Sequence, residues 1–195
     1  MDNKQWFRQA GFGMMIHWGL YSLPAGEWKG RRMSDIGEWA QEYFRIPMAE
    51  YSRLAGVFNP ILFDAEEWVK LAEDAGMKYI VFTAKHHECF AMFKSEVSEY
   101  NIVGGYTSGK TWCGGKAYWT NNWDFPDDEH KNFSKCFERK IKPQVKEILT
   151  KYGDLCLIWF DCPNTISPAE TDELYAMVKK YQPDCLVNSR IGNGR

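Results

Sequence analysis

The chain has 195 residues, enough for one domain with a hydrophobic core, and its 45% hydrophobic and 26% charged residues are ordinary for a soluble protein. The formal net charge of −2 at pH 7 argues against a nucleic-acid partner or an anionic membrane surface. The N-terminus has no apolar signal region and no stretch is long enough to span a membrane, so we expect a soluble protein, cytoplasmic as it stands.

Tryptophan and cysteine are the informative residue types. Aromatic residues make up 16% of the chain, with 9 Trp, and flat Trp rings often wall sugar sites. A large aromatic core explains most of them better. None of the 6 Cys forms a close pair of the zinc or redox type, which favours a reducing compartment over a disulfide scaffold.

Two apolar runs in the first half predict buried strands that end in polar residues. One covers residues 12–17 and ends at His17, and the other covers residues 79–83 and leads into His86 and His87. A core histidine at a strand end is the alternative explanation for His17. Buried strands of this kind occur in parallel sheets covered by helices, so we expect an α/β barrel or an open doubly wound sheet.

Helices are predicted between these two strands. A short helix opens at Glu38 and is broken by Pro47, and residues 48–57 form a second candidate. Asp64 is a good N-cap for a third helix, which Gly76 ends.

The second half begins with an irregular stretch. Residues 103–128 contain neither a helix pattern nor an apolar run, and a loop this long is either functional or a sign that an element is absent. A helix over residues 132–152 follows, which Pro143 should kink or divide. Ser167 opens another helix with a capping box, and residues 185–188 predict the last strand.

Asp161 directly follows the apolar run of residues 155–160. A carboxylate is costly inside such a run unless it is paired or faces a wet site. We therefore expect Asp161 at the C-terminal mouth of a buried strand, where barrel enzymes place their chemistry. An Asp that merely starts the following loop is the alternative, and the spacing does not decide between them.

Five motifs in chain order resemble the α-L-fucosidases of glycoside hydrolase family 29: His17-Trp18-Gly19, Glu38-Trp39, Lys85-His86-His87, Trp159-Phe160-Asp161 and Asn188-Ser189-Arg190. Any one motif alone would be weak, but five in order are specific. The resemblance implies that residues 1–195 form part of the glycoside hydrolase catalytic domain, an α/β fold with a partial (β/α)8 TIM-like barrel. The β-sandwich that usually follows in the family is expected to be absent.

The resemblance also implies roles for individual residues. Asp161 matches the nucleophile of a retaining hydrolysis of terminal α-L-fucose, in which a glycosyl-enzyme forms. Trp159 matches a pocket residue beside it. The residues that match positions holding the fucose hydroxyls or walling the sugar are His17, Glu38, Trp39, His86, His87 and Arg190. Fucosylated glycans are the implied substrates, no metal or cofactor is expected, and the family is often exported or lysosomal.

The chain also departs from the family pattern. Residues 100–103 run straight into residues 104–106, where the family has a helix and a strand, so we expect one internal βα unit and the C-terminal strands to be missing. The family's acid/base Glu lies beyond the motif that ends at Arg190, and Glu88 does not match it. We therefore expect little activity from this chain.

Two alternatives to a fucosidase remain. A non-catalytic module that binds fucose or another carbohydrate could retain part of the pocket. A metal hydrolase could use His17, His86, His87 and Asp161 as ligands. The metal site is disfavoured because the first strand lacks a His-x-His pair. Neighbouring His86 and His87 would also point to opposite faces if the strand continued.

Overall fold

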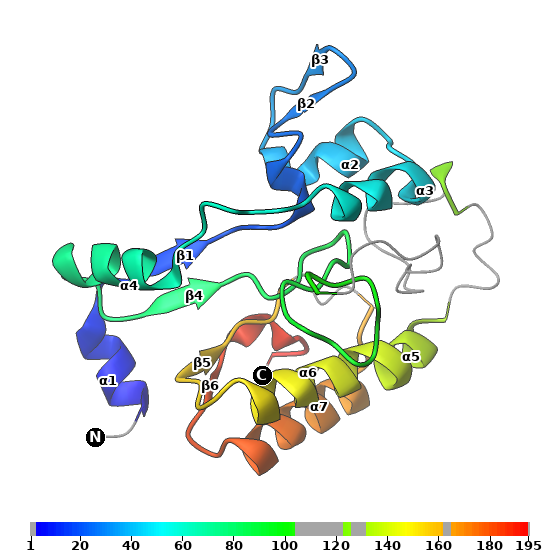
Figure 1. Ribbon diagram of the computed structural model, residues 1–195. Coiled ribbons are helices and arrows are strands. Elements are labelled where there is room, and N and C mark those ends of the chain that lie inside the picture. Colours follow the sequence, from blue (N-terminus) through cyan, green and yellow to red (C-terminus); the bar gives the residue numbers. More distant parts are fainter. Residues whose placement is uncertain (1–2, 104–122, 126–131, 162–164, 195) are drawn as a thin grey trace. The chain divides into compact units, whose positions relative to one another are not determined.

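The computed structural model describes residues 3–103, 123–125, 132–161 and 165–194 (Figure 1). The chain divides into two compact units, Ala10–Trp112 and Met1–Gln9 together with Cys113–Arg195. Most of the irregular stretch predicted at residues 103–128 lies outside the described residues. Within the described part, no helix has both the length and the apolar character to cross a membrane.

The first unit contains the two strands predicted in the first half of the chain. Strand β1 (Met14–Ile16) pairs in parallel with β4 (Ile80–Phe82). Helix α4 (Ala65–Asp74) lies between them in the chain and begins at Asp64, whose side chain accepts from two backbone N–H groups of the first turn. Both strands and the N-cap therefore confirm the sequence prediction, although the strands are shorter than the apolar runs.

Short elements connect β1 to α4. Residues 20–32, which do not carry a strand pattern, include the antiparallel hairpin of β2 (Glu27–Trp28) and β3 (Arg31–Arg32). The helices here are short, and they comprise 3-10 turns at Leu20–Ser22, Gly37–Trp39 and Ser52–Gly56, together with α2 (Ala40–Tyr43) and α3 (Met48–Tyr51). The helix expected from Glu38 thus starts as a 3-10 turn, and the helix expected over residues 48–57 ends as one.

The core of the first unit is aromatic. Tyr51, Phe90 and Tyr100 are fully buried together with Leu20 and Ile46. The rings of Phe90 and Tyr100 meet edge to face, with centroids 5.1 Å apart. This core lies around the segment that follows β4, so it supports the histidines that come at the end of that strand.

The second unit contains the other two predicted strands. Strand β5 (Leu157–Ile158) pairs in parallel with β6 (Leu186–Val187). Helix α7 (Pro168–Tyr181) connects them and begins with the capping box predicted at Ser167. Helices α6 (Lys142–Lys151) and α7 lie side by side (Figure 1).

The long helix expected over residues 132–152 forms as three consecutive segments. These are α5 (Phe133–Cys136), a π-helical turn (Phe137–Ile141) and α6. Pro143 lies at the start of α6 and has no N–H for the hydrogen bond of a regular helix, and the wider π turn precedes it. The interruption predicted from Pro143 is confirmed.

Two further features were not predicted. The N-terminal residues form helix α1 (Asn3–Ala10), and the Asn3 side chain donates to the Asp184 carbonyl across 2.8 Å. Cys89 forms a disulfide, and its partner lies outside the described residues. The expectation of reduced cysteines is therefore wrong for Cys89, whereas Cys136, Cys156 and Cys185 are free.

Candidate active site

The histidines after β1 and β4 lie together in the first unit. Because these strands are parallel and paired, their carboxyl ends meet at one edge, and the segments that follow bring His17 and His86 into contact. The two rings are perpendicular, with centroids 5.6 Å apart. The His86 and His87 rings are 4.7 Å apart, so they do not point to opposite faces. The strand ends at Phe82, before alternation would separate them.

His87 is held from two sides by the Glu38-Trp39 segment. The Trp39 ring stacks on the His87 ring at 4.6 Å with an interplanar angle of 15°. The His87 Nε2 lies 2.5 Å from the Glu38 carbonyl oxygen. A carbonyl only accepts, so Nε2 carries the proton and Nδ1 keeps its lone pair. Burial, and then neighbouring His86, lower the pKa of His87 to about 4. His87 is therefore neutral at physiological pH.

Glu88 is the residue that sequence reasoning missed. It is 1% exposed and lies beneath the histidines, with Oε2 3.8 Å from the His86 Nδ1. Burial raises the pKa of Glu88 to about 8, against the weaker opposite effects of its own backbone and of Lys85. Its burial also agrees with the view that it does not match the family's acid/base residue. A single acid just before the apolar run of residues 89–93 is the signal that could have drawn attention to it.

Gly19 is required for this burial. A Cβ atom at position 19 would lie 2.7 Å from the Glu88 Oε1 and 2.8 Å from Cε1 of Tyr21. Real Cβ atoms do not approach so closely, so any larger residue would displace Glu88 or Tyr21. The glycine of the His-Trp-Gly motif therefore makes room for an acid that lies almost 70 residues later in the chain.

Asp161, Trp159 and Arg190 belong to the second unit. Asp161 follows β5 and forms an ion pair with Arg190, which follows β6. The Phe160 N–H donates to the Asn188 side chain and the Phe160 carbonyl accepts from it, both at 2.8 Å, which fixes the two strand ends to each other. Asp161 and Trp159 are each about 44% exposed, so both side chains reach solvent.

Only one group of possible metal ligands is found among the described residues. It contains His86, His87 and Glu88 and includes neither His17 nor Asp161. The ligand atoms spread over as much as 4.8 Å, wider than about 4.4 Å, which is twice the longest zinc–oxygen or zinc–nitrogen bond. The His87 Nε2 is also engaged by Glu38. The arrangement therefore does not match a preformed zinc site.

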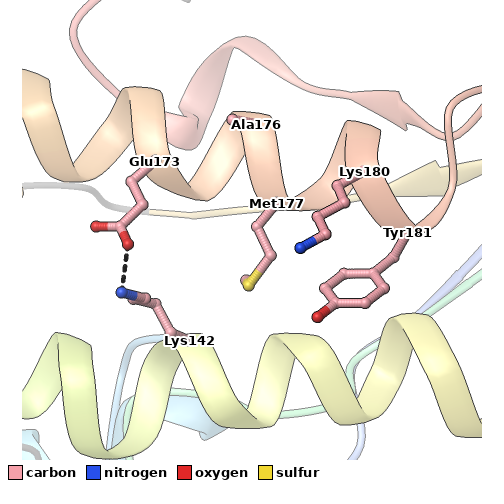
Figure 2. A pocket seen from close by; sticks show the side chains of 6 residues that line it. All are labelled: Lys142, Glu173, Ala176, Met177, Lys180 and Tyr181. Atoms are coloured by element: carbon pink, nitrogen blue, oxygen red, sulfur yellow. Dashed lines mark hydrogen bonds and ion pairs between the residues drawn. The ribbon is translucent and has the colours of Figure 1, made fainter.

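A surface hollow between α6 and α7 contains none of the residues predicted from the sequence. Figure 2 shows its lining, with Lys142 paired to Glu173 at one end, Met177 in the middle and Tyr181 at the other end. Lys142 also pairs with Glu138 one turn earlier at 2.9 Å. The Lys142–Glu173 pair connects the two neighbouring helices.

Parallel strands that present histidines, tryptophans and a carboxylate at their carboxyl ends are the arrangement of α/β enzymes of the barrel type. A model of the alpha-L-fucosidase family matches residues 1–110, more than half of the chain. The chain belongs to the alpha-L-fucosidase family.

Solved structures resemble nearly the whole chain. Alpha-L-fucosidase AlfC from Lactobacillus casei, in complex with its α-L-fucose product, is 43% identical with a TM-score of 0.90, over 100% of this chain and 71% of AlfC. The alpha-L-fucosidase from Vibrio sp. strain EJY3 is 33% identical with a TM-score of 0.86, over 98% of this chain and 38% of that protein.

Curated relatives are matched over less of their length. The tissue alpha-L-fucosidase of Rattus norvegicus is 40% identical over 101 residues, 48% of this chain and 22% of the rat protein. A putative alpha-L-fucosidase of Caenorhabditis elegans is 30% identical over 188 residues, 83% of this chain and 39% of that protein. The chain thus spans about a fifth of the rat relative and two fifths of the nematode one.

Proposed function

We propose that the chain is part of the catalytic domain of a retaining α-L-fucosidase, which removes terminal α-L-fucose from glycoconjugates through a glycosyl-enzyme on Asp161. The observation that carries this proposal is the placement of Asp161 after β5, ion-paired with Arg190 after the neighbouring parallel strand. The guanidinium orients the carboxylate, and the half-exposed side chain leaves an oxygen accessible to an anomeric carbon. Trp159, directly after β5, offers an apolar ring for the sugar.

The histidine cluster supplies the groups that would read the sugar hydroxyls. A neutral His87 that donates through Nε2 to Glu38 keeps Nδ1 as an acceptor for a hydroxyl. His17 and His86 lie in contact beside it, and Trp39 packs against the His87 ring. A site of this kind rejects a sugar that lacks a hydroxyl, because the buried polar partner is then left unpaired.

We further propose that the two parallel pairs belong to one partial (β/α)8 barrel that lacks an internal βα unit. Each pair is parallel, and the four strands alternate with helices along the chain, as such a barrel needs. The alignment with the nematode relative supports the deletion, because it extends over 188 residues yet takes in only 83% of a 195-residue chain. The relative therefore has residues that face gaps in this chain.

We also propose low activity on natural substrates, because the family resemblance matches no acid/base residue to this sequence. Retaining hydrolysis needs a second carboxyl about 5–5.5 Å from the nucleophile, to protonate the leaving oxygen. The resemblance assigns no such residue within residues 1–195, and Glu88 is buried. Loss of a general acid typically removes about 10²–10⁴-fold of rate. An aryl fucoside, whose leaving group needs little protonation, should therefore be the better substrate for this polypeptide.

Fucose binding without catalysis is the second candidate. The observation in its favour is the histidine cluster beside Trp39, in which a neutral His87 can hold a sugar hydroxyl without help from a nucleophile. The two candidates differ in whether Asp161 acts as a nucleophile and forms a glycosyl-enzyme.

Covalent trapping separates these candidates. A 2-deoxy-2-fluoro-α-L-fucosyl donor with an activated leaving group should add one sugar to the chain, and peptide mass spectrometry should locate it on Asp161. Asp161→Asn should abolish the adduct, whereas Asp154→Asn, at another exposed aspartate of the same unit, should not. Fucose binding with no adduct would support the binding module. A label on another residue, or turnover unaffected by Asp161→Asn, would contradict the proposed mechanism.

A further inference from the structure

Glu88 is a buried acid to which neither the resemblance nor the proposed mechanism gives a role. It directly follows His86 and His87 in the chain, and its carboxyl Oε2 lies 3.8 Å from the His86 Nδ1. Its Oε2 has no hydrogen-bond partner among the described residues. A fully buried polar atom that is left in this state costs about 1–3 kcal/mol or more, so its retention calls for an explanation.

The groups around Glu88 come from several elements. Tyr21, Tyr51 and Tyr100 lie near it, and burial, followed by the nearby Glu88 carboxylate, raises the pKa of Tyr51 and Tyr100. Burial also raises the pKa of Tyr21, to which Glu88 and then Glu38 contribute. Lys85 is the cation that acts on Glu88 within the described part of the chain, and its effect is smaller than that of burial. The tyrosines stay neutral, so at physiological pH the titrating partner of His86 in this pocket is Glu88.

We propose that Glu88 is a positioning residue whose carboxyl forms a hydrogen bond with the His86 Nδ1. This bond determines whether the His86 Nε2 donates a hydrogen bond to the sugar or accepts one from it. The part of this proposal that concerns the sugar rests on the proposed function. The part that concerns the histidine stands on the first unit alone, where both residues lie.

The direction of the hydrogen bond follows the proton of Glu88. A protonated carboxyl donates its O–H to the His86 Nδ1, so Nε2 carries the imidazole proton and donates to a sugar oxygen. When Glu88 loses its proton, the carboxylate accepts from Nδ1–H instead, and Nε2 becomes an acceptor. The present separation of 3.8 Å exceeds a hydrogen bond of about 2.7–3.2 Å. The proposal therefore includes a small side-chain movement in the free protein that brings the two atoms into hydrogen-bond range.

The burial of Glu88 makes this change occur near physiological pH. Because burial raises its pKa to about 8, the carboxyl is protonated at pH 6.5 and ionised at pH 9.5. His86 should therefore donate through Nε2 at the lower pH and accept through Nε2 at the higher pH. A purely structural acid would fill the same space without changing the tautomer of the imidazole.

Nitrogen-15 NMR of the imidazole groups in the full chain tests the tautomer without any sugar, with His86→Gln to assign the signal. We expect the His86 Nε2 to be protonated at pH 6.5 and the proton to move to Nδ1 with a midpoint near pH 8. Glu88→Gln, whose amide donates at every pH, should keep Nε2 protonated throughout. Glu99→Gln, at an exposed glutamate of the same segment, should behave as the wild type.

Three results would overturn the proposal. They are a tautomer that does not change near pH 8, a change that persists in Glu88→Gln, and saturable shifts of His86 and His87 with ZnCl₂ that Glu88→Gln abolishes. The last result would make the cluster a metal site. Fucose titrations then test the sugar part. Loss of affinity above pH 8 in the wild type but not in Glu88→Gln supports it, and equal pH dependence in both proteins refutes it. Absence of fucose binding, with the tautomer change intact, would refute the proposed function and leave the Glu88–His86 pairing standing.

Discussion

The free energy of unfolding should fall as the pH rises from about 4.5 to about 8, because of Glu88. Burial raises the pKa of its carboxyl from 4.5 to about 8, so the folded protein holds a proton that the unfolded chain releases in this range. The folded state then binds more protons than the unfolded state, and stability decreases as the pH rises. At about 1.36 kcal/mol per pKa unit, the whole effect amounts to at most about 5 kcal/mol.

Glu88→Gln removes this dependence, because glutamine does not titrate. His87 acts in the opposite direction, since its pKa is lowered to about 4 by burial and then by His86. The unfolded chain takes up that proton first, so stability is lost as the pH falls from about 6.5 to about 4. Both proteins retain this acid-side loss, and the difference between their stabilities isolates Glu88.

Urea unfolding followed by tryptophan fluorescence, at about one-unit steps between pH 5 and pH 9, measures this difference. Between pH 5 and pH 9, we expect the free energy of unfolding of Glu88→Gln to rise by several kcal/mol relative to that of the wild type. Glu99→Gln is the matched control and should follow the wild type, because its side chain is exposed. Parallel curves for wild type and Glu88→Gln would refute the reasoning, and would mean that Glu88 is ionised in the folded protein at neutral pH.

Three further changes test the packing. Gly19→Ala should lower the free energy of unfolding by about 1–3 kcal/mol, because the new Cβ would lie 2.7 Å from the Glu88 Oε1. Gly56→Ala should not, because a Cβ there meets nothing within 4 Å. Thermal unfolding of both variants tests this difference. Ser167→Ala should cost about 1 kcal/mol in urea unfolding through loss of the α7 capping box, and an unchanged midpoint would contradict it. Asn188→Ala removes both strand-end hydrogen bonds at 2.8 Å and should reduce labelling at Asp161, with mass spectrometry as the measure; undiminished labelling would show that they do not position it.

Local signals identified the parts of the fold that are determined by nearby residues. Apolar runs that end in polar residues predicted the strands β1, β4, β5 and β6, and their parallel pairing within each unit is observed. Asp64 and Ser167 were recognised as N-caps because the capping residue and its partners lie within a few positions of each other. Pro143 disturbed its helix because the missing N–H is a property of that residue alone.

The features that were missed depend on contacts between distant parts of the chain or on segments too short for a periodic pattern. The hairpin of β2 and β3 has two residues in each strand, too few for alternation to be visible. Helix α1 has eight residues and no acidic residue in its first turn to mark its start. The buried Glu88 lies near Tyr21, Tyr51 and Tyr100, which no local window connects to it.

The contact between Gly19 and Glu88 suggests why the His-Trp-Gly motif and the Lys-His-His motif occur together. His17 and His86 meet because β1 and β4 are paired in parallel, but pairing alone does not fix the imidazole rings. Because position 19 has no Cβ atom, the Glu88 carboxyl can pack against it, with Oε2 3.8 Å from the His86 Nδ1. A change at Gly19 should therefore act on His86 through Glu88, although Gly19 carries no functional group. The imidazole nitrogen-15 spectrum of Gly19→Ala measures this directly, and we expect the tautomer change of His86 near pH 8 to be lost or displaced. An unaltered change in a folded Gly19→Ala protein would show that the two motifs act independently.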